Sequence, residues 1–112
     1  MREKDLSVTL LYDFYAALIS EKKREVFEMY YFEDLSLAEI SEHTKTSRQG
    51  VRELIVRTGE ELREFENALG LFEKEKQEGK LRDSLLAIAE RIERDYPQDA
   101  EFIRANFLQK GE

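Results

Sequence analysis

The stretch LSLAEISEHTKTSRQGVRELI, residues 35–55, has the pattern of two short helices joined by a three-residue turn. Ser36 and Glu39 stand at the spacing of a capping box, in which each side chain bonds the other residue's backbone N–H. Ser47 can cap a second helix whose inward-facing positions recur at helical spacing: Val51, Leu54, Ile55 and Thr58. This capped pair predicts a helix-turn-helix over residues 36–58, with its recognition helix starting at Ser47.

The second helix of a helix-turn-helix presents the side chains of its first turns to a nucleic-acid groove. Arg can bond guanine through two hydrogen bonds and Gln can bond adenine, while polar groups at a helix start suit phosphate. Such side chains gather at the start of this helix, and we expect them to bind nucleic acid: Lys45, Ser47, Arg48, Gln49 and Arg52. A basic run upstream would add phosphate contacts: Lys22, Lys23 and Arg24.

The turn departs from the usual helix-turn-helix pattern. Such proteins generally have a small residue in the first helix and Gly in the turn, and these places hold Ser41 and Lys45. A Lys in a left-handed conformation costs about 1 kcal/mol, and Thr44 and Thr46 replace residues that are usually apolar. We therefore expect a turn that is looser or differently shaped. The basic face, which also carries Glu53 and Arg57, has a second interpretation as an ordinary solvated surface.

The composition favours helices throughout a small protein. The chain has 112 residues with one proline and five glycines, and Glu, Lys, Arg, Leu and Ala are abundant. It has no cysteine, which excludes disulfides and thiolate metal sites. No window approaches the roughly 18 apolar residues of a membrane span, and the charged start is unlike a signal peptide. We expect a cytoplasmic protein without membrane insertion.

No pattern in the sequence indicates an enzyme. His43 is the only histidine, and a surface position near a helix end is its favoured interpretation over a weak metal site with Glu39 and Glu42. There is no Gly-rich phosphate loop, and the many acidic side chains are typical of solvated helix faces. We therefore expect no catalytic residue, no metal and no cofactor.

Apolar residues recur at helical spacing on both sides of the helix-turn-helix. They predict a helix over about residues 5–19, a second helix capped by Ser20, and a long fourth helix that continues to Phe72. Gly79 is expected to mark a helix boundary. The helix that begins after Gly79 is expected to end at Pro97, which disfavours helix at the residue before it. Apolar stripes mark that helix (Leu81, Leu85, Ile88 and Ile92) and a last short one (Ala100, Phe102, Ile103, Phe107 and Leu108).

The helices predict two parts, a helix-turn-helix domain over residues 1–60 and a helical extension over residues 61–112. The apolar stripes of the extension exceed what the N-terminal core can cover. An apolar face without a partner in its own chain usually finds one in another chain. We therefore predict a two-fold homodimer built largely on residues 62–108. The alternative is that the C-terminal helices fold back on the N-terminal half.

The net charge of −7 bears on the choice of partner. Tight binding to nucleic acid depends on neutralising phosphates, so an acidic chain needs a local basic patch for it. An acidic protein can also dock on a basic, RNA-binding partner. Two functions therefore stay open: a regulatory protein that binds nucleic acid, and a protein–protein adaptor that uses the helix-turn-helix as a scaffold.

Three pieces of the sequence are distinctive: LYDFY (11–15), MYYFEDLSLAEI (29–40) and SRQGV (47–51). Together, over about Leu10 to Lys74, they closely resemble the YlxM family of bacterial proteins, also called p13-like. In that family Ala usually stands in place of Gly50. The resemblance implies an all-α fold similar to region 4 of sigma factors, to which this chain adds a C-terminal helical extension. It carries recognition-helix positions over to Ser47, Arg48, Gln49 and Arg52, and it implies no catalytic residue.

The resemblance also implies a cellular setting. The genes of the family typically neighbour those of the signal recognition particle GTPases, which implies that the family assists or regulates that targeting pathway. For a regulator, the expected partner is DNA or the RNA of the particle. For an adaptor, the expected partner is one of the GTPases or the particle itself.

Overall fold

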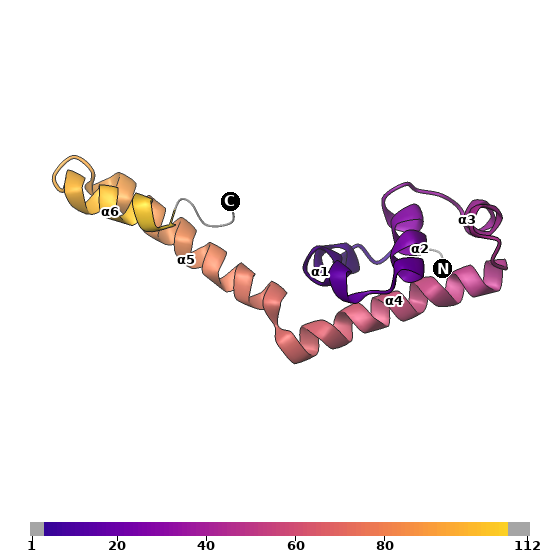
Figure 1. Ribbon diagram of the computed structural model, residues 1–112. Helices are drawn as coiled ribbons and strands as arrows, with labels where there is room; N and C mark the ends of the chain where they lie inside the picture. Colours follow the sequence, from indigo (N-terminus) through magenta and orange to yellow (C-terminus); the bar gives the residue numbers. More distant parts are fainter. Residues whose placement is uncertain (1–3, 108–112) are drawn as a thin grey trace. The chain divides into compact units, whose positions relative to one another are not determined.

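The computed structural model describes residues 4–107 (Figure 1). Within that range every regular element is a helix, which confirms the predicted all-α fold. Helices α3 and α4 form the predicted helix-turn-helix. In chain order the elements are α1 (Ser7–Tyr15), the 3₁₀ helix η1 (Ala16–Leu18), α2 (Glu21–Tyr31), α3 (Leu37–Thr44), α4 (Arg48–Leu69), α5 (Leu71–Ile92) and α6 (Pro97–Phe107).

The chain divides into two compact units, residues 1–72 and residues 73–112. We call them the N-terminal unit and the C-terminal unit. The sequence places a boundary between residues 60 and 61, which lies inside the continuous helix α4. Residues 61–72 therefore belong to the same unit as the helix-turn-helix.

The N-terminal unit packs around α4, because α1, α2 and α3 all lie against this helix (Figure 1). Two apolar clusters fill these contacts, and full burial of each large apolar side chain contributes about 1.5–3 kcal/mol. The first cluster consists of Val8, Tyr12, Tyr15, Ile19, Phe27 and Leu62. The second consists of Val26, Tyr30, Ile40, Val51 and Ile55. Since α4 contributes to both clusters, its buried face fixes which of its side chains point outward.

Serine N-caps begin α2, α3 and α4, as the sequence predicts. Ser20 and Ser47 each accept a hydrogen bond from the backbone N–H three residues further along the chain. Ser36 does the same, and the Glu39 carboxylate accepts from the Ser36 backbone N–H at 2.8 Å, which completes the capping box. Each such cap is worth about 1 kcal/mol. The cap at Ser47 also fixes Arg48 as the first residue of α4.

The turn between α4 and α5 is tied to α1 by a buried tyrosine. The Tyr15 hydroxyl donates to the Glu66 carboxylate at 2.6 Å and accepts from the Leu71 backbone N–H at 3.0 Å. Glu66 also accepts from the Phe72 backbone N–H at 3.0 Å. Burial and the neighbouring carboxylate raise the pKa of Tyr15, so this hydroxyl keeps its proton and its donor role.

Two predicted helix boundaries are wrong, and both involve a glycine. The helix expected to continue to Phe72 ends at Leu69, because Gly70 takes the left-handed conformation of a C-cap with φ +63°. Gly79, expected to mark a boundary, lies inside α5. A glycine costs a helix interior about 1 kcal/mol, and the strong helix formers around Gly79 sustain a helix across it.

The end of the chain differs in one detail from the prediction. Helix α5 ends at Ile92, and Pro97 is the first residue of α6 rather than the stop of α5. Proline suits a first helical position because the N–H it lacks would be unbonded there anyway. Leu108, which the sequence places in the last helix, lies outside the described residues.

We expect Ser36→Ala to lower the free energy of unfolding by about 1 kcal/mol, because the Glu39 backbone N–H loses its acceptor. Urea unfolding followed by circular dichroism measures the change. The control is Asn67→Ala at an exposed position of α4, where Ala is the better helix former and no loss is expected. Equal losses in the two variants would contradict the role of the cap.

The capping box also predicts a pH dependence. Hydrogen bonds from Ser36 hold the pKa of the Glu39 carboxyl below its ordinary value of 4.5. The ionised carboxylate therefore stabilises the fold above pH 4.5, and that contribution is lost as pH falls through the lower folded-state pKa. We expect the wild type to be more stable than Glu39→Gln at pH 7, and the difference to shrink in acid. A difference between their unfolding midpoints that is constant from pH 7 to pH 3 would contradict this.

Candidate nucleic-acid interface

The turn of the helix-turn-helix is held by Ser41. Lys45 follows α3 with φ 57°, which confirms the left-handed conformation expected from the sequence. The Ser41 carbonyl accepts from the backbone N–H groups of Lys45 and Thr46, and its hydroxyl donates to the Thr46 carbonyl. Ser41 thus supplies three hydrogen bonds, one of them through its side chain, and the turn is fixed rather than loose.

Gly50, in the first turn of α4, leaves room for the side chain of Thr46, the residue before the N-cap. Its N–H donates to the Ser47 hydroxyl at 3.0 Å. A Cβ at position 50 would lie 2.8 Å from the Thr46 methyl carbon, closer than such atoms approach in proteins. A residue larger than glycine at position 50 would therefore collide with the Thr46 side chain as it is placed in this structure.

All five residues expected to bind nucleic acid have exposed side chains at the turn or on the first two turns of α4: Lys45, Ser47, Arg48, Gln49 and Arg52. The four positions expected to face inward, Val51, Leu54, Ile55 and Thr58, are instead buried or half-buried. Val51 and Ile55 are buried, Thr58 is buried with its hydroxyl bonded to the Leu54 carbonyl, and Leu54 is half-buried. The sequence therefore separated the outer face of α4 from its inner face correctly.

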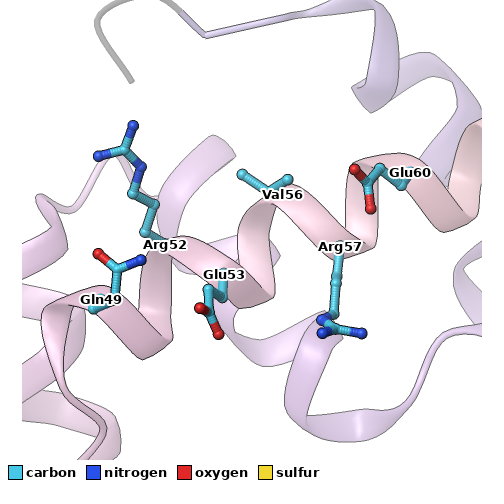
Figure 2. Close-up of a pocket in the computed structure, with 6 residues that line it drawn as sticks. All are labelled: Gln49, Arg52, Glu53, Val56, Arg57 and Glu60. Atoms are coloured by element: carbon cyan, nitrogen blue, oxygen red, sulfur yellow. The ribbon is translucent and has the colours of Figure 1, made fainter.

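Figure 2 shows a shallow depression along the outer face of α4, lined by two rows of side chains. The rows follow the helical spacing of four residues: Gln49, Glu53 and Arg57 in one, and Arg52, Val56 and Glu60 in the other. Each row holds one acidic and one basic side chain, and Val56, which stands between Arg52 and Glu60 in its row, is 44% exposed. Beyond Arg52 the face is therefore mixed in charge rather than continuously basic.

Most basic side chains of the N-terminal unit are held by interactions within the fold. Within residues 4–72, five of them donate to a carboxylate or a carbonyl: Lys4, Lys22, Lys23, Arg24 and Arg63. Four have no hydrogen bond or ion pair in that range: Lys45, Arg48, Arg52 and Arg57. All four lie between residues 45 and 57, on the turn and the outer face of α4.

The three upstream basic residues differ in their surroundings. Lys22 is exposed, and its ammonium lies 3.4 Å from the Thr44 carbonyl, beside the turn. Lys23 pairs with Glu61 at 2.8 Å, and Arg24 donates to the Ile19 carbonyl at 2.9 Å. Phosphate binding by these residues stays a prediction, and the geometry favours Lys22 for it.

The sequence prediction did not include Val56 and Arg57 among the residues that bind a partner through this face. Both stand at helical spacing from predicted residues, since Val56 is four after Arg52 and Arg57 is eight after Gln49. Extending the stripe by two turns would have found them. The prediction stopped at Arg52 because it considered only the residues that enter a groove.

The acidic side of α3 carries the residues considered for a metal. Glu39, Glu42 and His43 are exposed and line a shallow depression. In the part of the chain that the structure describes, no three ligand side chains are grouped to hold a metal ion. Nor does any helix within residues 4–107 have the length and apolar character to cross a bilayer.

Residues 2–102 match the family UPF0122, whose description is "Putative helix-turn-helix protein, YlxM / p13 like". The chain belongs to this family. The resemblance seen in the motifs is thereby confirmed, and its coverage extends through most of the C-terminal unit.

Similar proteins come from several bacteria. A UPF0122 protein of Caldanaerobacter subterraneus subsp. tengcongensis is 49% identical over 77 residues, which cover 69% of this chain and 66% of that protein. The aligned part thus spans just under two thirds of that relative. A UPF0122 protein of Anoxybacillus flavithermus is 42% identical over 105 residues, or 93% of this chain and 92% of that one. A third, from Geobacillus kaustophilus, is 40% identical over 101 residues, or 90% and 89%.

We expect Lys45→Gly to raise the free energy of unfolding by about 0.5–1 kcal/mol, because glycine adopts the left-handed conformation without steric cost. Lys45→Ala removes the same charge but keeps a Cβ, so it should give no such gain. Thermal or urea unfolding of both variants measures the difference. Equal effects of Gly and Ala would show that Lys45 is not strained.

Proposed function

We propose that this protein is a regulatory helix-turn-helix protein that binds nucleic acid through the turn and the start of α4. One observation carries the proposal: of the four basic side chains left without partners in residues 4–72, three lie on that surface (Lys45, Arg48 and Arg52), and Arg57 follows further along the same face of α4. Residues 4–72 as a whole comprise 9 basic and 14 acidic side chains, a net charge of −5. Binding to phosphate therefore depends on this local patch.

Each exposed side chain of the surface has a role in this proposal. Arg48, Gln49 and Arg52 would contact base edges, since Arg suits guanine and Gln suits adenine. Ser47 and the free backbone N–H groups at the start of α4 would bind a phosphate, helped by the positive end of the helix dipole. Lys45 would contact the neighbouring phosphate backbone. The rigid turn at Ser41 favours this role because it holds these groups in place.

The cellular setting is proposed from the family. Membership of the YlxM/p13-like family supports a role beside the signal recognition particle in the cytoplasm, where the nucleic acid would be DNA or the RNA of the particle. The fold would then resemble region 4 of sigma factors, in which a helix-turn-helix also ends in a reading helix.

A second function is favoured by the mixed face beyond Arg52. Protein interfaces place apolar contact area within a polar rim, and here the charged side chains of Arg52, Glu53 and Glu60 surround the exposed Val56. The net charge of −7 would steer the protein toward a basic partner. In this alternative the protein is an adaptor that binds a signal recognition particle GTPase, without catalytic chemistry of its own.

We expect Arg48→Ala combined with Arg52→Ala to weaken nucleic-acid binding by tenfold or more. Fluorescence anisotropy over a salt series measures it with two probes, a random-sequence DNA duplex and a transcript of the particle RNA. On the random-sequence duplex, where no particular base is bound, the two guanidinium groups would contact phosphates instead, and their loss would reduce the steepness of the slope of log K against log salt by about 1.8. Lys76→Ala combined with Lys80→Ala removes the same charge from α5 and should change little.

The outcome separates the two functions. Absence of binding to both probes at low salt, or equal losses in the two double variants, would contradict the nucleic-acid role. The adaptor is tested with purified GTPases of the particle, by pull-down and by GTP hydrolysis. Val56→Glu should then abolish the complex, while nucleic-acid binding by the start of α4 would persist.

A further inference from the structure

The described part of the C-terminal unit, residues 73–107, buries no large apolar side chain completely. Within residues 73–107 the buried apolar side chains are two alanines, Ala89 and Ala100, while both apolar clusters belong to the N-terminal unit. Six large apolar side chains of the unit are only half-buried: Leu85, Leu86, Ile88, Ile92, Ile103 and Phe107. Ordering each residue costs about 1–2 kcal/mol of backbone entropy. Two buried alanines cannot offset that cost for two helices.

Helices α5 and α6 form an antiparallel hairpin (Figure 1). The segment 93–96 joins them, and an ion pair at 2.6 Å links Arg104 of α6 to Glu93. Near the far end of the hairpin, Leu81 and Phe107 line one shallow depression. Because α6 covers α5 from one side only, much of the apolar surface of both helices remains open.

The open surface has the pattern of a helix-packing seam. Leu81, Leu85, Ile88 and Ile92 stand at spacings of four, three and four, which are the a and d positions of a heptad repeat. Such seams pack in bundles at helix crossing angles near 20°. Leu81 is 56% exposed although it belongs to this seam, and Phe102 on α6 is 66% exposed. A further pair of helices would complete the core.

The seam favours a second copy of the hairpin as the occupant, because apolar a and d positions pack against the same positions of an identical helix. Residues 73–107 comprise 7 basic and 9 acidic side chains, a net of −2, against −5 for residues 4–72. Self-association through the two hairpins therefore brings together less like net charge than self-association through the two N-terminal units. We propose that α5 and α6 form the dimerisation element of this protein, two hairpins packing about a two-fold axis into a four-helix bundle.

Sedimentation equilibrium of the full chain tests the proposal. The wild type should have twice the 13.3 kDa mass of one chain at micromolar concentration. Ile88→Glu places a charge in the seam and should give a monomer. Ala87→Glu places the same charge on the neighbouring exposed position of α5 and should leave the dimer intact.

Two further variants keep the test decisive. Ile88→Ala removes apolar contact without adding charge, and it should weaken the dimer at least tenfold even if Ile88→Glu unfolds the hairpin. Leu10→Glu alters an exposed apolar side chain of α1, 51% exposed, and should leave the dimer unchanged. A monomeric wild type would overturn the proposal. So would a dimer that resists both Ile88 variants, or one that Leu10→Glu dissociates.

Discussion

The N-terminal unit depends on the burial of one face of α4. Val51, Ile55 and Leu62 enter two apolar clusters that bring α1, α2 and α3 onto a single helix. Once that face is buried, the opposite face must point to solvent, so the core and the candidate interface are two sides of one constraint. The cap at Ser47 adds the second condition, because it fixes the residue from which the helical stripe is counted.

Local features of this fold could be predicted from the sequence, and features that depend on distant residues could not. The serine caps and the strained Lys45 each follow from a few neighbouring residues. Gly70 and Gly79 show the limit, because both stand among helix formers. Gly70 ends a helix where Tyr15, 56 residues from Leu71, accepts the N–H freed by the turn. No comparable bond to a distant residue is described at Gly79, and the helix continues through it.

The same distinction applies to the candidate interface. The pattern of residue types and spacings identified the exposed start of α4. It could not show which basic side chains are already bonded to carboxylates or carbonyls within the fold. The partner of Lys23 is Glu61, 38 residues away in the sequence, so that ion pair leaves no trace in the local pattern. A basic residue therefore becomes a credible ligand-binding group only when its surroundings in three dimensions are known.

The close approach of Thr46 to Gly50 has a consequence for the family's evolution. A Cβ at position 50 would strike the threonine methyl at 2.8 Å, so an alanine there requires a different residue or rotamer at position 46. The two positions lie on opposite sides of the cap and should not vary independently among relatives. An ancestor that exchanged one of them first would have passed through a strained intermediate, which favours lineages that keep the two residues together as a pair.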